Sequence, residues 1–363
     1  MIIYIIFFIF IAVLAAISSY SQSFRENTLI RLSILLLLIL FVGLRGDDVS
    51  VDDPNYRIAF DSVESPIDYF INFSEWTFFE PFYYLIPSIV KLFFTKYYTI
   101  IFLVYAFTSI SLKFNSIKKY TDLFYPSLLV YFSFLFFLHD FTQIRASVAG
   151  SLMLFSLRYV KNRELPKFLL TIIISCFFHY SSLVFFPIYF ISTTNSKKVI
   201  YIILLCLSII ISFIDTSFIL NSLPLEMSVL TNKAENYRNL AEQGFLTDLN
   251  KFNTNIIIFT LLSFFYLLKI DFLKTKNEYA IICIKIQVLA LFLFQILSSI
   301  PAIAFRVSEL GYTVTIITIP FVMYFTKNKL LSFFILLLIC IILFYLNIFK
   351  HNLILPYKFV SEW

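Results

Sequence analysis

Long apolar segments recur along the whole chain of 363 residues and alternate with short polar stretches. An α-helix needs about 20 mainly apolar residues to cross the hydrocarbon core of a bilayer, and most of the segments come near that length. The pattern predicts an all-α, polytopic integral membrane helical bundle of about 12 spans, forming a single transmembrane domain over residues 1–363. The expected spans are 2–20, 28–44, 97–112, 122–138, 142–160, 167–180, 181–193, 198–216, 254–270, 279–299, 304–326 and 330–349.

Some apolar segments depart from a simple span. Residues 81–95 contain Pro87 and Lys91, so we expect a re-entrant or interfacial helix there. Segments 167–180 and 181–193 are each too short to cross about 30 Å at about 1.5 Å per residue. They predict either a broken helix pair that meets near His179 or a single long, tilted span.

Basic residues in short loops indicate the orientation of the chain in the membrane. With the N-terminus outside, nearly all of them are cytoplasmic, and the exceptions are Lys350 and Lys358. Two sizeable loops, 45–80 and 217–253, then lie on the extracytoplasmic side, where residues 229–243 have the spacing of an amphipathic surface helix. The basic residues assigned to the cytoplasmic side are Arg25, Arg31, Lys113, Lys118, Lys119, Arg158, Lys161, Arg163, Lys167, Lys197, Lys198, Lys269, Lys274, Lys276, Lys327 and Lys329.

Composition supports a membrane protein and removes several other classes. Hydrophobic residues make up 60% of the chain and charged residues 14%, with a mean hydropathy of +0.88, whereas a soluble domain has about a quarter charged residues. The net charge of +6 follows the membrane topology, and no nucleic-acid-binding signature accompanies it. The chain has five glycines and no P-loop or dinucleotide fingerprint. Its four cysteines lie far apart in apolar segments, which favours packing roles over a disulfide framework or a metal site.

The first outer loop begins with the densest cluster of charges, Leu44–Phe60. Charges at a membrane boundary must be solvated, paired or bound to a ligand. Arg45 can extend to the interface, or it can bind a phosphate or pyrophosphate through its planar guanidinium group. The aspartates of the loop fit a solvated turn, a divalent cation or sugar hydroxyls equally well. They are Asp47, Asp48, Asp52 and Asp53.

Further polar residues also fall on the predicted outer side. Arg145 follows His139 and Gln143 at the expected start of a helix, where the helix dipole attracts anions. It is a candidate for binding a negatively charged group, and the alternative is a structural ion pair with Asp140 or Glu309.

His179 lies where two short apolar segments meet, and broken helices in membranes usually line a cavity. Its alternative role is a hydrogen-bonded packing residue. Arg306 lies at the predicted outer start of another helix. Its alternative role is a structural ion pair with Glu309, three residues later.

Five short motifs follow one another along the chain. They are Arg45 with Asp52 and Tyr56; EPFYYL, Glu80–Leu85; QIRASVAGSL, Gln143–Leu152; FHYSSLVFFP, Phe178–Pro187; and Arg306 ahead of Tyr312. In this order, over most of the chain, they resemble the EpsG-like branch of the Wzy-type polysaccharide polymerases, bacterial membrane proteins of exopolysaccharide, capsule and O-antigen assembly. The family's glycine before the early acidic residue is Val51 here, and we match that acid to Asp52.

The resemblance implies transfer of a growing glycan from undecaprenyl pyrophosphate onto a lipid-linked repeat unit at the outer face of a bacterial plasma membrane. Arginines at helix starts can stabilise the charge of the leaving pyrophosphate, and a histidine can accept a hydroxyl proton. The expected catalytic residues are Arg45, Arg145, His179 and Arg306. The expected substrate-binding residues are Asp52, Tyr56, Glu80, His139, Gln143, Tyr180, Ser181 and Tyr312.

This reaction calls for no metal and no cofactor. The expected partners are the undecaprenyl-pyrophosphate-linked oligosaccharide, membrane lipid, and a chain-length regulator and a flippase of the same pathway, with no nucleic acid. The main alternative is a GT-C glycosyltransferase that uses a polyprenyl-phosphate sugar, with Asp47 and Asp48 as base and metal ligands. A lipid-linked oligosaccharide flippase or other transporter is the alternative from another class, and an O-antigen ligase would differ only in its acceptor.

Overall fold

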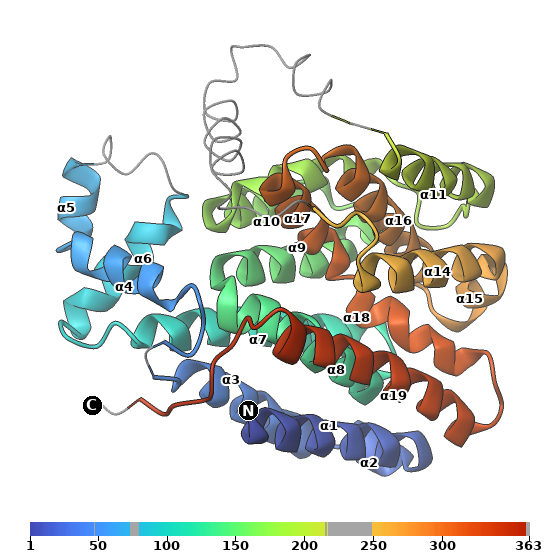
Figure 1. Cartoon of the computed structure of the whole chain (residues 1–363), viewed down its shortest axis with the longest axis horizontal. Helices are drawn as coiled ribbons and strands as arrows, with labels where there is room; N and C mark the ends of the chain where they lie inside the picture. The colour runs from blue at the N-terminus through green and yellow to red at the C-terminus, as the bar shows by residue number, and fades with distance from the viewer. Residues whose placement is uncertain (47, 73–79, 215, 217–248, 361–363) are drawn as a thin grey trace. The chain divides into compact units, whose positions relative to one another are not determined.

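The computed structural model describes residues 1–46, 48–72, 80–214, 216 and 249–360 (Figure 1). In these residues the elements are helices, and the extended pairing consists of two isolated bridges. The expectation of an all-helical chain is therefore confirmed for the described part. Outside it lie the amphipathic helix expected at 229–243 and residues 73–79 of the expected outer loop 45–80.

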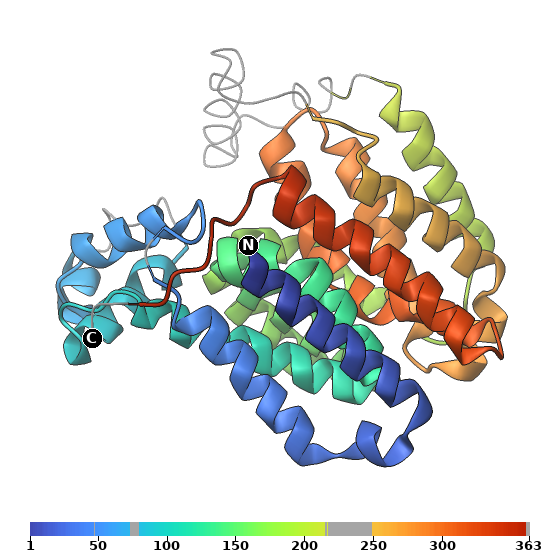
Figure 2. The ribbon, with the colours of Figure 1, turned by 60° about the horizontal axis from the view of Figure 1, so that its bottom comes forward.

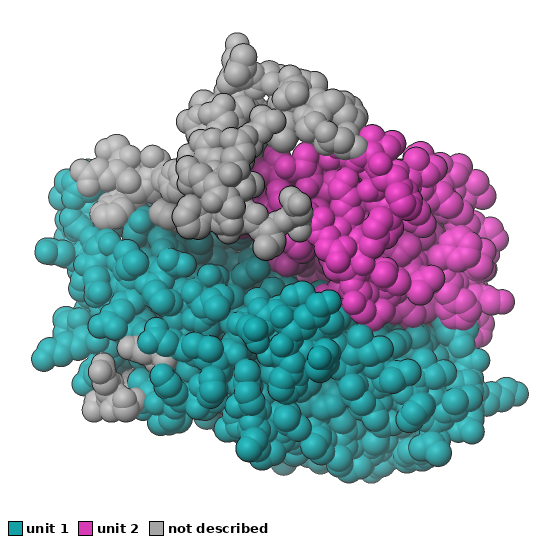
Figure 3. Space-filling view, viewed as in Figure 1, with its two compact units in different colours: residues 1–189, 315–363 teal, residues 190–314 magenta. Residues whose placement is uncertain are grey.

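The chain divides into two compact units, residues 1–189 with 315–363 and residues 190–314 (Figure 3). The helices of the first unit are α1 Ile2–Tyr20, α2 Gln22–Glu26, α3 Thr28–Gly43, α4 Asp53–Ser62, α5 Pro66–Ile71, α6 Phe82–Phe93, α7 Ile100–Tyr120, α8 Phe124–Ser133, η2 Phe136–Thr142, α9 Ile144–Asn162, α10 Leu165–Phe178, η3 Tyr180–Phe190, α18 Thr315–Thr318, η4 Ile319–Tyr324, α19 Lys329–Tyr345 and η5 Leu346–Lys350. The described helices of the second unit are α11 Lys198–Ser212, α14 Thr254–Leu268, α15 Ile270–Lys276, α16 Ala280–Ile296 and α17 Pro301–Tyr312.

Helix α7 lies at the centre of the first unit, where it packs against α3 on one side and α9 on the other, while α1 packs against α8 (Figure 2). All ten residues of α8 are buried. The contact between α3 and α7 is close at Gly43, where an added Cβ would come within 2.8 Å of the Leu103 Cα. Only a residue without a side chain fits there.

Three described helices are long and apolar enough to cross a membrane, and up to six such spans result if each bent pair counts as one. The three are α1, α7 and α19 with η5, and six shorter apolar helices accompany them. The total of 12 spans stays a prediction. Helix α6 has 12 residues, about 18 Å, which fits the re-entrant or interfacial helix expected there.

The broken pair expected near His179 is present. Helix α10 ends at Phe178, His179 has an extended backbone with φ −155° and ψ 117°, and a 3-10 helix follows from Tyr180. The single long span, the other alternative, is wrong. The loop 45–80 is also more ordered than a simple loop, because α4 and α5 lie within it.

The segment after η5 returns to the loop that follows α3 (Figures 1 and 2). Phe359 forms an antiparallel bridge with Arg45, and Ile354 forms one with Ser50. The Tyr4 hydroxyl donates a hydrogen bond to the Leu355 carbonyl oxygen at 2.9 Å. Residues 354–360 therefore connect α1 with the start of the first outer loop.

Candidate functional site

A buried polar network holds the chain just before α9. Asp140 lies in the π-helical turn η2 and accepts hydrogen bonds from the Lys113 amine at 2.8 Å and the Tyr131 hydroxyl at 2.7 Å. The hydroxyls of Ser147, at 2.6 Å, and Ser109 also donate to it. Lys113 was expected in a cytoplasmic loop, and this expectation is wrong, since its side chain is fully buried in α7. A pattern of charges in short loops does not reveal a lysine whose carboxylate partner lies inside the bundle.

Arg45 is also fully buried, and its guanidinium group contacts other residues of the protein. Its guanidinium forms an ion pair with Asp53 at 3.0 Å and donates to the carbonyl oxygens of Asp140 and Phe141 at 3.3 and 2.8 Å. The Asp53 carboxylate in turn accepts the N–H groups of Val49 and Ser50. The acid at Arg45 is therefore Asp53. Asp52, which we matched to the family's early acid, is the residue just before α4, and its half-buried side chain makes no capping hydrogen bond to that helix.

Three of the expected residues meet around one carboxylate. Glu80, immediately before α6, forms an ion pair with Arg145, the second residue of α9. The other carboxylate oxygen of Glu80 lies 3.9 Å from His179 Nδ1 and accepts the Tyr180 N–H at 3.5 Å. Exposure of the Arg145 side chain is 17% and that of Glu80 is 6%. Arg145 is thus within reach of a ligand, and it forms an ion pair with Glu80, while Asp140 pairs with Lys113.

Tyrosines surround the Arg145 guanidinium. The ring of Tyr83 lies 4.3 Å from it in a cation–π contact, and the Tyr83 hydroxyl donates to the Asn55 carbonyl oxygen at 2.8 Å. Tyr56 of α4 interacts with Arg145 as well, and burial raises the pKa of the Tyr56 hydroxyl. That hydroxyl stays protonated at neutral pH and can donate a hydrogen bond.

His179 is held by its own chain. The Ser181 N–H donates to His179 Nδ1 at 3.3 Å, and the Ser182 N–H donates to the His179 carbonyl oxygen at 3.0 Å. Ser182 and Ser175 join η3 to α10 through a hydrogen bond of 2.7 Å between their hydroxyls. The break in the helix therefore fixes the imidazole beside Glu80.

An apolar groove begins next to these residues, between α10 and η3. It encloses about 490 Å³ and almost all of its lining is carbon. Its lining residues are Leu169, Ile172, Ile173, Cys176, Phe177, Tyr180, Leu183 and Phe186. Tyr180 lines the groove, and its backbone N–H faces Glu80, so the groove borders the polar cluster at this residue.

The remaining expected residues have other positions. His139 is fully buried in η2, and within the described part of the chain neither of its ring nitrogens has a hydrogen-bond partner. Gln143 is the residue before α9 and is half-buried. Arg306 and Tyr312 belong to α17 of the second unit, where Arg306 is exposed and Tyr312 is buried against Phe259. Their part in a shared site stays a prediction.

Sequence reasoning missed several residues of this region as site residues. Tyr83, Asp53 and Lys113 contact the predicted residues or the turn that carries them. Tyr83 lies inside the EPFYYL motif, so its position three residues after Glu80 was a usable signal. Among the described residues, no group of three or more His, Cys, Asp or Glu side chains is placed to hold a metal ion.

We name the Glu80–Arg145–His179 group, together with Tyr56, Tyr83 and Tyr180, the Glu80 cluster. Comparison with curated proteins and with solved structures found no match. The model of the EpsG family matches residues 27–359, nearly the whole chain, and the protein therefore belongs to the EpsG family.

Proposed function

We propose that this protein is a membrane polysaccharide polymerase that transfers a growing glycan from undecaprenyl pyrophosphate onto a lipid-linked repeat unit. Membership of the EpsG family indicates a membrane protein of the glycan-polymerase type. The observation that carries the proposal is Glu80, whose two carboxylate oxygens face Arg145 and His179. In this proposal Glu80 holds Arg145, the cation for the leaving group, close to His179, the base for the acceptor hydroxyl.

Arg145 is suited to the leaving group. Departure of the pyrophosphate breaks the bond between the sugar C1 and the phosphate oxygen, and negative charge accumulates on that oxygen. A guanidinium group has five N–H donors in a planar fork, and one carboxylate engages at most two of them. Arg145 can therefore keep its pair with Glu80 and still donate to a phosphate, which stabilises the charge as it develops.

His179 is suited to the acceptor. As the acceptor hydroxyl oxygen bonds to C1, its proton must move to a base, and imidazole has a pKa close to neutrality. In the neutral ring one nitrogen accepts and the other donates. Nε2 can take the proton in the tautomer whose hydrogen is on Nδ1, which lies 3.9 Å from the Glu80 carboxylate. In that tautomer Nδ1 gives up the hydrogen bond that it accepts from the Ser181 N–H, and Glu80 favours the imidazolium that forms.

The apolar groove next to the Glu80 cluster is the proposed binding site for the tail of the lipid carrier. The groove between α10 and η3 has an apolar lining and reaches Tyr180 of the Glu80 cluster. An isoprenoid chain is a long apolar ligand, and a groove with an apolar lining can take it without burying a polar group. In this proposal the tail lies in the groove and its pyrophosphate lies at Arg145.

Arg45 has a different role in the proposal from the one expected. Its buried contacts with Asp53, Asp140 and Phe141 make it a positioning residue that fixes the turn before α9. Arg306, exposed on α17, is proposed as a further contact for the substrate's negative charge.

The test is a deletion strain and the purified protein. Loss of the gene is expected to abolish long surface polysaccharide on a gel while a single repeat unit is retained. The protein in liposomes is expected to lengthen lipid-linked repeat units without a nucleotide sugar. Complete loss of the lipid-linked precursor in the deletion strain would instead indicate an earlier glycosyltransferase and would contradict the proposal.

A further inference from the structure

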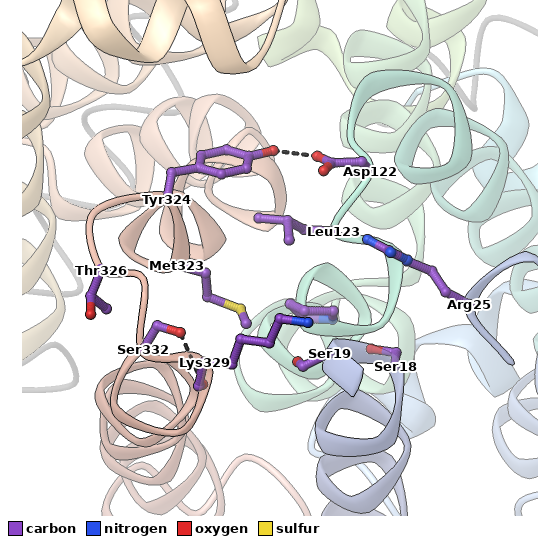
Figure 4. A pocket seen from close by; sticks show the side chains of 11 residues that line it. Ser18, Ser19, Arg25, Asp122, Leu123, Met323, Tyr324, Thr326, Lys329 and Ser332 are labelled. Carbon is purple, nitrogen blue, oxygen red and sulfur yellow. Dashed lines mark hydrogen bonds between the residues drawn. The ribbon is translucent and has the colours of Figure 1, made fainter. Parts of the chain in front are cut away.

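A second pocket lies at the other end of the first unit (Figure 4). It encloses about 280 Å³ between the end of α1, α2, the turn from α7 to α8, and the turn from η4 to α19. Helix α7 has 21 residues, about 30 Å in length. Its beginning is near the Glu80 cluster, where Tyr105 donates to the Phe82 carbonyl oxygen, and its end is at this pocket. The two sites are therefore separate.

Two cations, Arg25 and Lys329, enter the pocket. Arg25 from α2 and Lys329 from the start of α19 reach into it from opposite sides in Figure 4. Neither has an ion pair in the part of the chain that the structure describes, and Lys329 only faces the ring of Tyr20 at 5.7 Å. The Asp122 carboxylate is at the edge of the pocket and accepts a hydrogen bond from the Tyr324 hydroxyl.

The positive charge extends past Arg25. A neighbouring pocket of about 340 Å³ shares Arg25 and Asp122 with the first and adds further charged residues. These are Glu26, Arg31 and Lys118. Around the two pockets, four cations face two carboxylates, so the combined surface attracts an anion.

We propose that this basic pocket binds the phosphate of an anionic phospholipid of the membrane leaflet on that side. The sequence pattern assigns Arg25, Lys118 and Lys329 to the cytoplasmic side, and basic pockets between transmembrane helices on that side suit anionic headgroups. The phosphate lies between Arg25 and Lys329.

The rest of the lining favours a lipid over a small soluble anion. Leu123, Pro126 and Met323 form an apolar part of the pocket wall that suits the glycerol and acyl region. Hydroxyl groups of the same pocket can bond the ester or glycerol oxygens. They are Ser18, Ser19, Thr326 and Ser332.

Bound lipid connects segments that are far apart in the sequence. It bridges α2 to the start of α19, and a ligand that binds only the folded state stabilises that state by mass action. The experiment is thermal unfolding of the full-length protein in detergent with added phosphatidylglycerol, phosphatidylcholine or inorganic phosphate. Phosphatidylglycerol is expected to raise the unfolding midpoint, and the other two are not.

The variant that tests the residues is Arg25→Gln with Lys329→Gln, which is expected to weaken the effect of phosphatidylglycerol by about tenfold in concentration. The matched control is Lys274→Gln with Lys276→Gln on α15, basic residues of the same predicted side that do not line the pocket. If the double variant does not fold, Lys329→Gln alone serves, because Lys329 is exposed.

Equal stabilisation of the variant and the control by phosphatidylglycerol would overturn the proposal, as would no stabilisation of the unmodified protein. If inorganic phosphate reproduces the full effect with the same dependence on Arg25 and Lys329, the pocket takes a soluble anion and the lipid assignment is wrong.

Discussion

At the scale of single residues, Glu80 organises the candidate site. It is 65 positions from Arg145 and about 100 from His179 along the chain, yet it contacts both. Arg145 is thereby held in one orientation while 17% of its side chain stays exposed. Substitutions of Arg145 and of Glu80 should therefore have separate, measurable effects on polymerisation.

Arg145→Lys is expected to lower polymerisation strongly, by about 10²- to 10³-fold, because an ammonium group cannot hold Glu80 and a phosphate in the same planar geometry. The measurement is chain extension by protein in liposomes. Arg158→Lys is the matched control, since Arg158 lies on the same helix and contacts Asn115 and Phe155 instead. Full activity of Arg145→Lys would remove the guanidinium from the mechanism.

Glu80→Gln is expected to lower polymerisation by at least about tenfold, because the uncharged amide no longer stabilises the imidazolium or orients Arg145. Glu64→Gln, in the same outer loop and exposed, is its control. Both variants keep the size of the side chain, so gel-filtration profiles should match that of the unmodified protein. A Glu80→Gln protein that polymerises normally would show that the acid is structural.

The sequence allowed the polar residues to be identified but did not determine their pairs. The structural alternative for Arg145 was an ion pair with Asp140 or Glu309, whereas in the fold Arg145 pairs with Glu80 and Asp140 pairs with Lys113. Asp53 rather than its neighbour Asp52 meets Arg45 for the same reason. Which carboxylate reaches which cation depends on helix packing, and the local pattern of residues contains no information about that packing.

At the scale of elements, the π-helical turn η2 is the support of the site. Single π turns inside helices occur frequently at functional sites, and here the turn places Asp140 among Lys113, Tyr131 and two serines. Its carbonyl groups also receive Arg45. The start of α9, and with it Arg145, is therefore fixed by buried polar contacts and not by apolar packing alone.

Asp140→Asn is expected to destabilise the fold by about 3–5 kcal/mol, because it leaves the Lys113 ammonium buried without a charge partner. Unfolding in detergent, followed by circular dichroism, measures the loss. Asp140→Asn with Lys113→Met should recover much of the stability, since the unpaired charge is then gone. Unchanged stability of the single variant would mean that Lys113 is not charged in the folded protein.

Helix breaks were more predictable than these contacts. The break at His179 follows from two apolar segments that are each too short to span, and the structure has it between Phe178 and Tyr180. The end of α3 at Gly43 agrees to within one residue with the expected segment 28–44. The bend of 64° between α8 and η2 was not predicted, because it depends on the approach of neighbouring helices. The length of an apolar segment indicates whether it can cross the lipid bilayer. The bends within each span depend instead on the helices that pack against it.

At the scale of the whole molecule, the Glu80 cluster and the basic pocket lie at opposite ends of α7. The positive-inside pattern predicts that the basic pocket lies at the cytoplasmic side, and on that prediction the cluster faces outward. Lipid-linked sugars at the outer leaflet would then meet the site directly. This orientation has a direct test.

In a Cys206→Ser background, Glu64→Cys is expected to react with a membrane-impermeant thiol reagent in intact cells, and Lys118→Cys is expected to react only after the cells are opened. Both positions are exposed. Labelling is read on a gel by mass shift. The reverse pattern would invert the topology and place the Glu80 cluster inside the cell.

The pairing of residues 354–360 with the loop after α3 has a consequence for biogenesis. Roughly 300 residues separate the two bridged segments, and a ribosome adds about 5–20 residues per second. Arg45 and Ser50 therefore wait on the order of 15–60 s before their bridging partners Phe359 and Ile354 are synthesised. During that interval the two bridges to residues 354–360 are absent. We therefore expect nascent chains to be most open to quality-control proteases before the last residues are synthesised.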